Sequence, residues 1–216
     1  MANLSLVKSL SRLKEEQQHS DEVLLTPLGL TFTRGSVIEI AGDHSSGRTS
    51  AALSLLAKLT SDGEICALVD SCDSYDPCTA LLAGVRNENL LWVKCGGVLE
   101  NAFMAADLLV QAKGFGAIWL NLNGLSQSKL RMVPKTYWYR YRNRISQTPT
   151  MVMVTSPEPV TGSASHQSLT LTREKVVWSG VGRFKLLREF RIKMGSRKQY
   201  YSQPVQAKLE FDYRDV

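Results

Sequence analysis

The sequence contains no long apolar run and no cysteine pair of the kind that binds metal. None of its apolar stretches approaches the roughly eighteen residues that a membrane-spanning helix needs. The four cysteines form no C-x-x-C motif and have no histidine at ligand spacing, which argues against a zinc site and a disulfide framework. Residues 1–20 lack the apolar core of a signal peptide. We therefore expect a cytoplasmic protein with reduced thiols, no bound metal and no membrane partner.

Charge is distributed unevenly along the 216 residues. Between Arg131 and Lys198, fourteen lysines and arginines stand against three acids, whereas the rest of the chain has twelve basic and seventeen acidic residues. Length and an apolar share of 44% predict one core domain with short appendages. The basic C-terminal half favours a phosphate-rich partner or an acidic protein, and a merely solvated charged face is the alternative.

A glycine-containing loop follows the short apolar run at residues 37–40. The segment Gly42-Asp43-His44-Ser45-Ser46-Gly47-Arg48-Thr49 has the pattern G-x-x-x-x-G-K-[ST], with arginine in the lysine position. In such a loop, backbone N–H groups cradle phosphates, the cationic side chain reaches the terminal phosphates, and the last hydroxyl holds magnesium. The candidate nucleotide-binding residues are Gly42, Ser46, Gly47, Arg48 and Thr49. The alternative is a strand-to-helix turn that binds nothing.

Apolar runs and helical patterns alternate from residue 37 to residue 154. Strands are predicted at 37–40, 65–69, 90–93, 117–122 and 151–154, and helices at 50–59, at 102–113 and after Pro134. This order predicts an α/β fold with a mainly parallel sheet flanked by helices. The segments 190–194 and 205–213 alternate apolar and polar residues, which predicts antiparallel strands added at the C-terminal end of the sheet. Residues 156–168 are rich in Pro, Gly, Ser and Thr and are predicted to form a loop.

The two ends of the chain carry candidate partner-binding residues. Leu6, Leu10 and Leu13 recur at helical spacing, so residues 1–22 are predicted to be an amphipathic helix and linker, and residues 23–216 the core domain. Near the other end, Arg191, Lys193 and Arg197 place charge beside a predicted edge strand that could pair with a partner. The alternative is that both ends are buried within the monomer.

The helix after Pro134 mixes aromatic residues with arginines. Tyr137, Arg140, Arg142 and Arg144 could bind DNA by stacking on bases and attracting phosphates. The alternative is a crossover helix whose aromatic side chains face the sheet while its arginines are solvated.

Several motifs together resemble a RecA-type core over residues 29–154. They are Arg34–Gly42, Ser45–Thr49, Val69-Asp70 followed by Asp76-Pro77, and the spacing to Glu88–Leu91. The short length, the degenerate motifs and the ending from Phe190 to Arg197 are most similar to the ImuA family, the RecA-like accessory proteins of bacterial mutasomes. The resemblance implies a RecA-like fold and a role in the SOS response to DNA damage.

The sequence departs from an active ATPase of this superfamily at five positions. The resemblance places Asn121 where a magnesium-ordering aspartate is expected, and Cys72 where a water-activating glutamate is expected. A thiol cannot serve there as the carboxylate base. Thr79 replaces an adenine-stacking tyrosine, Ser156 a nucleotide-sensing glutamine, and Arg48 the loop lysine. We therefore expect no enzyme activity and no cofactor beyond weak ATP binding.

These features together predict a catalytically degenerate RecA-like adaptor in translesion mutagenesis. By resemblance, its partners are ImuB and RecA, with DNA as a further ligand. Two alternatives remain open. One is a weak ATP-dependent RecA paralogue acting on DNA, and the other is a SulA-like cell-division inhibitor, which shares the fold without the nucleotide chemistry.

Overall fold

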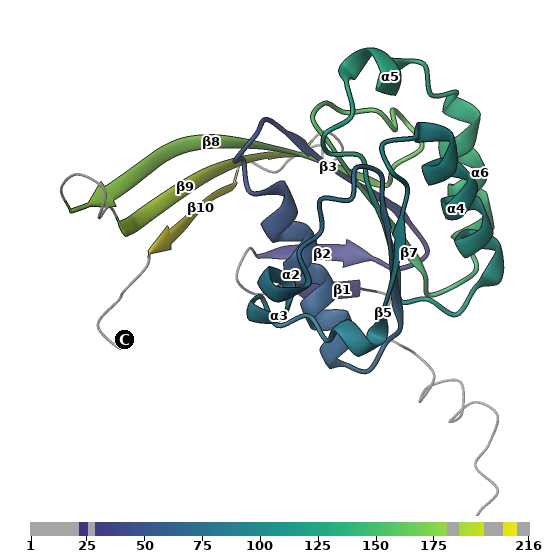
Figure 1. Cartoon of the computed structure of the whole chain (residues 1–216), viewed down its shortest axis with the longest axis horizontal. Helices are drawn as coiled ribbons and strands as arrows, with labels where there is room; N and C mark the ends of the chain where they lie inside the picture. Colours follow the sequence, from purple (N-terminus) through teal and green to yellow (C-terminus); the bar gives the residue numbers. More distant parts are fainter. Residues whose placement is uncertain (1–21, 26–28, 181–185, 197–204, 211–216) are drawn as a thin grey trace, which may run out of the picture.

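An eight-stranded sheet runs through the middle of the molecule (Figure 1), with the strand order β10-β9-β8-β3-β7-β6-β4-β5. The computed structural model describes residues 22–25, 29–180, 186–196 and 205–210. Five parallel strands form the central part: β3 (Val37–Gly42), β4 (Cys66–Asp70), β5 (Leu90–Lys94), β6 (Ala117–Asn121) and β7 (Met151–Ser156). The strand β8 (Gln167–Ser179) runs parallel to β3, while β9 (Leu186–Ser196) and β10 (Val205–Glu210) are antiparallel. The predicted α/β fold is confirmed, including its antiparallel end.

Helices cover both faces of the sheet (Figure 1). On one face, α2 (Arg48–Ser61) packs together with the hairpin of β1 (Glu22–Leu25) and β2 (Leu30–Thr33). On the other face lie α4 (Leu99–Ala112) and α6 (Lys135–Ile145). The shorter elements are α3 (Pro77–Leu82), η2 (Asn87–Asn89) and α5 (Gln127–Arg131). Within the described ranges, no helix is long and apolar enough to cross a membrane.

The central strands are apolar on both sides because both sides are covered. In β3, Ile38 and Ile40 face the α2 layer, and in β7, Val152 and Val154 face the α4 and α6 layer; all four are buried. A strand buried on both faces is a nearly continuous apolar run rather than an alternation, which is how these strands stand out in the sequence. Burial of this kind contributes most of the stability of the fold.

Several elements were not predicted. The long strand β8 was missed because its middle, from Arg173 to Lys175, is charged and exposed. The hairpin β1–β2 and the short helix α5 were also missed, and β1 begins at Glu22, the last residue of the predicted linker. These elements are too short or too polar for a periodic signal.

A loop, not a helix, connects β7 to β8. The buried carboxylate of Glu39 holds this loop by accepting hydrogen bonds from the backbone N–H groups of Val160 (2.6 Å) and Thr161 (2.7 Å) and from the hydroxyl of Ser168 (2.6 Å). A buried carboxylate needs such donors, because burial without them is costly. The predicted loop at residues 156–168 is confirmed, and it overlaps β8 by two residues.

The strands β8, β9 and β10 extend beyond the helical layers as a curved arm (Figure 1). The pairing of β8 with β9 is shifted between Arg173 and Lys175 and again between Val177 and Trp178. Shifts of this kind bend a strand and increase its twist, which explains the curvature of the arm.

Candidate nucleotide site

A cavity of about 580 Å³ lies at the carboxyl ends of β3, β4 and β6. We call it the nucleotide cavity, and we call residues 42–49 the phosphate loop. The cavity is lined by the loop residues from His44 to Thr49, by Cys72 after β4, and by Asn121 in β6, among others. The structure therefore brings together the loop and three of the departing residues that the sequence places far apart, Cys72, Thr79 and Asn121. Ligands of open α/β sheets bind at this end of the strands.

The two glycines of the phosphate loop are required by the protein itself, Gly42 by the backbone of strand β8 and Gly47 by its positive φ. Gly42 has φ 156° and Gly47 has φ 91°. A Cβ atom at Gly42 would lie 2.2 Å from the carbonyl oxygen of Leu171 in β8, and one at Gly47 would lie 2.7 Å from Cδ1 of Ile192 in β9. The glycine pattern thus has a structural explanation that needs no phosphate, and the arm supplies it.

The surroundings of Arg48 indicate an anion-binding site. Arg48 is the first residue of α2 and is only 6% exposed, yet its Nη1 has no hydrogen-bond partner among the described residues. Burial lowers the pKa of Arg48, and the nearby charge of Asp43 opposes that shift. The hydroxyl of Ser46 is also buried without a partner, and the helix N-terminus at Gly47 has no side-chain cap. Buried donors next to a helix N-terminus fit a phosphate group.

The side chain of Asn121 is fully engaged in a buried network. Its Nδ2 donates to Oδ1 of Asp70 at 3.3 Å and to the hydroxyl of Ser74 at 3.1 Å. Its Oδ1 accepts from the hydroxyl of Thr155 at 3.1 Å and from the backbone N–H of Asn123 at 3.2 Å. The amide therefore connects strands β4, β6 and β7 and leaves no carboxylate for magnesium at this position.

The carboxylate of Asp73, next to Cys72 in the sequence, is bound to the backbone. Asp73 accepts hydrogen bonds from the backbone N–H groups of Cys95 (3.0 Å) and Gly96 (3.2 Å), and it does not line the nucleotide cavity. The half-buried Cys72 is the residue that does line it. Among the described residues, no cluster of three or more His, Cys, Asp or Glu side chains could hold a metal ion.

The two remaining departures serve local structure. The hydroxyl of Thr79 donates to the carboxylate of Asp76, which caps α3. These contacts, first the hydroxyl and then the backbone N–H groups of Thr79 and Cys78, lower the pKa of Asp76. The hydroxyl of Ser156 is buried and donates to the carbonyl oxygen of Glu158 at 2.7 Å. Ser156 does not line the nucleotide cavity.

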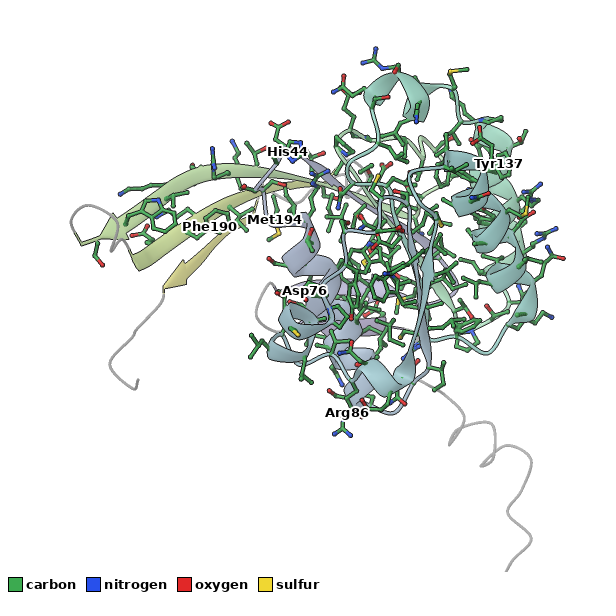
Figure 2. The ribbon with its side chains drawn as sticks, in the orientation of Figure 1. His44, Asp76, Arg86, Tyr137, Phe190 and Met194 are labelled. Carbon is green, nitrogen blue, oxygen red and sulfur yellow. The ribbon has the colours of Figure 1, made fainter. Side chains whose placement is uncertain are left out.

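The arginines of α6 are mostly engaged within the protein. Arg140 and Arg144 both form ion pairs with Asp107 of α4, at 2.8 and 3.1 Å, and Arg140 also stacks on Tyr137 at 4.5 Å from the ring centre. Trp138 and Tyr141 are buried in the core, while Arg142 is exposed. Figure 2 shows Tyr137 on α6 and His44 on the phosphate loop as separate parts of the molecule. DNA binding by α6 stays a prediction, and these contacts weigh against it.

The predicted partner-binding residues are only partly described. Leu6, Leu10, Leu13 and Arg197 lie outside the described residues. In β9, Arg191 forms an ion pair with Glu189, and Lys193 is exposed. No sequence signal indicated that the same strand, through Ile192, would pack against Gly47 of the phosphate loop.

The RecA N-terminal domain family matches residues 18–123. Two RecA proteins are similar in sequence. The one from Corynebacterium aurimucosum is 41% identical over 81 residues, which cover 38% of this chain and 21% of that protein. The one from Arthrospira platensis is 43% identical over 103 residues, which cover 47% of this chain and 28% of that protein. The matched region thus spans about a quarter of the length of these relatives.

One solved structure with the same fold is the crystal structure of the RadB recombinase. The two structures superpose with a TM-score of 0.59 over 86% of this chain and 91% of that chain, at 13% identity. At this identity the likeness shows the fold alone.

Proposed function

We propose that this chain, which belongs to the RecA-like superfamily, is a catalytically degenerate adaptor in DNA-damage tolerance. Its motifs are most similar to the ImuA family, and the proposed partners are ImuB and RecA. In this role the RecA-like core serves as a scaffold for protein contacts rather than as a motor driven by ATP hydrolysis.

The observation that carries the proposal is the engagement of Asn121. Its amide occupies the position of a magnesium-ordering carboxylate and is bound on both sides by Asp70 and Thr155. The residue in the position of the catalytic base is Cys72, and the nearest alternative carboxylate, Asp73, is bound to backbone N–H groups. Phosphoryl transfer depends on positioned metal and a positioned water, and these residues supply neither.

Nucleotide binding is a separate question from hydrolysis. ATP would supply a triphosphate anion, and the residues that fit it are Arg48 and Ser46, whose buried donors lack partners, together with the N-terminus of α2. An arginine has a wide planar fork where a compact ammonium is usual, and the amide of Asn121 stands where the resemblance places a magnesium-ordering carboxylate. We expect weak ATP binding that depends little on magnesium.

A second candidate function is a weak ATP-dependent RecA paralogue acting on DNA. The buried Nη1 of Arg48 favours it, because a buried donor is expensive to leave without an acceptor and an anion would supply one. This candidate differs from the adaptor in one measurable property, which is turnover of ATP.

The deciding experiment measures ATP hydrolysis by the purified protein with and without single-stranded DNA. The adaptor proposal predicts a rate at background. The matched control is Thr49→Ala, which removes the loop hydroxyl that would hold magnesium. Turnover that disappears in Thr49→Ala would favour the paralogue. Proteins captured from DNA-damaged cells with the tagged chain should then include ImuB and RecA if the adaptor proposal is right.

A further inference from the structure

A second cavity, the hairpin cleft, lies between the phosphate loop and the arm. Its volume is about 650 Å³, and its walls include Ser45 and Ser50 on one side and Arg173, Trp178 and Phe190 on the other. It shares Ser45, Gly47 and Ser50 with the nucleotide cavity, so the phosphate loop separates the two. We propose that the hairpin cleft binds single-stranded nucleic acid, with bases on its aromatic side chains and a phosphate on Arg173.

The aromatic wall of the cleft includes an exposed tryptophan. Trp178 is 57% exposed, whereas Trp119 and Trp138 are fully buried. Phe190 and Val176 are partners in the register of β8 and β9, and both line the cleft. Figure 2 shows Phe190 farther out along the arm than Met194, which is buried against the body. An exposed indole beside a phenyl ring is a surface on which unstacked bases can stack.

The charge of the arm matches a polyanion. Within the strands β8 and β9 the sequence has five basic and two acidic residues. Arg173, Lys175 and Lys193 are exposed, and none of them has an ion pair within the described part of the chain. On α6, by contrast, two of the three arginines share the carboxylate of Asp107. Arg173 is the cation that lines the hairpin cleft, while Lys175 and Lys193 are exposed elsewhere on the arm.

The combination of groups favours a single strand over other polyanions. An acidic protein surface would use the charges but would leave Trp178 without a partner suited to its flat face. The bases of a duplex are stacked on each other and cannot reach an indole on the protein. In a single strand both the bases and the phosphates are accessible. This inference does not rest on the adaptor role, because it needs neither ImuB nor RecA.

The test compares DNA binding of full-length variants by fluorescence anisotropy, with a labelled oligothymidylate of about thirty nucleotides at several salt concentrations. The double variant Trp178→Ala with Arg173→Gln should bind at least about tenfold more weakly, since stacking of one base and one phosphate contact are lost. The slope of log affinity against log salt should become shallower by about 0.7 for the lost phosphate contact. Thr49→Ala, which changes the nucleotide cavity only, and Lys135→Gln, an exposed cation of α6, should bind like the unchanged protein.

A second measurement reads the contact itself. Bound oligothymidylate should quench part of the tryptophan fluorescence, and Trp178→Phe should bind DNA while losing that quenching. Both variants are at exposed positions, so equal melting temperatures check that they fold. The inference is overturned if the unchanged protein does not bind the oligonucleotide, or if the double variant binds normally. It is also overturned if DNA binding is lost instead in the α6 variant with Arg140, Arg142 and Arg144 changed to glutamine. The same conclusion follows if the double variant binds DNA normally and loses only its binding to an acidic protein.

Discussion

The side-chain amide of Asn121 donates a hydrogen bond to the carboxylate of Asp70 at 3.3 Å. This bond joins the ends of the neighbouring strands β6 and β4. Both residues are buried, Asp70 completely. An amide can donate to this carboxylate, whereas a second carboxylate would repel it. Asn121 therefore stabilises the sheet by joining β4 and β6.

The first prediction concerns Asn121→Asp. Two buried carboxylates in contact repel each other, so the variant should be less stable at pH 7 by about 1–3 kcal/mol. In the folded variant the pKa of one carboxyl is raised above its unfolded value. Relative to the unchanged protein, the destabilisation is therefore smallest below about pH 4 and grows as the pH rises through the raised pKa. Thermal melting at pH 4, 5 and 7 measures this.

The control for this change is Asn101→Asp, which places the same new charge on the exposed first turn of α4, where it should be neutral or slightly stabilising. A stable Asn121→Asp protein that gains magnesium-dependent ATP turnover would refute both the repulsion argument and the degenerate assignment.

The second prediction concerns Arg48→Met. Removing a buried cation that lacks a partner should raise the melting temperature, by about 2–4 °C for each 1 kcal/mol gained in a chain of this length. Inorganic phosphate should stabilise the unchanged protein, by about 1.4 kcal/mol at ten times its dissociation constant, and should not stabilise the variant. Melting curves with phosphate or with chloride at equal ionic strength separate the two effects. Equal stabilisation of both proteins by phosphate would place the anion elsewhere.

The third prediction concerns the cysteines. Cys78 is exposed, whereas Cys66 is fully buried and its burial raises the pKa of the thiol to about 12. Iodoacetamide at pH 8 should therefore modify Cys78 quickly in the folded protein and Cys66 only after unfolding, because the thiolate is the reactive form. Mass spectrometry of the digested protein reports each site. Modification of both at the same rate would show that β4 is accessible.

The raised pKa of Cys66 also predicts a dependence of stability on pH. The neutral thiol is favoured in the folded state, so this contribution is complete below the unfolded pKa of about 8.5 and is lost as the pH rises toward 12. The free energy of unfolding, measured with urea, should fall less steeply between pH 8 and 11 in Cys66→Ala than in the unchanged protein.

The fourth prediction concerns the apolar stripe formed by Leu6, Leu10 and Leu13 near the N-terminus. If Leu6 and Leu10 dock on RecA, then Leu6→Asp with Leu10→Asp should weaken RecA binding in a pull-down and leave the melting temperature nearly unchanged. The matched control is Lys8→Asp, which changes charge in the same segment but between the two leucines. Normal RecA binding by the leucine variant, or loss of its folding, would assign the stripe to the core instead.

The sequence alone determined those parts of the protein that have a local periodic signal. The central strands were predictable because burial on both faces makes them continuous apolar runs, and α6 because Pro134 precedes a helical pattern. The phosphate loop was predictable because its residue types are fixed by short-range backbone geometry.

Only the tertiary structure decided what those residues do. A Cβ at Gly42 would meet the backbone of Leu171 in β8, far along the chain, and Arg140 and Arg144 meet one carboxylate on another helix. The network of Asn121 and the hairpin cleft likewise depend on strands that are distant in sequence. Local patterns record which face of an element is buried, but contacts between distant elements follow from the way the sheet is ordered and curved, and single residues carry no signal of their eventual neighbours.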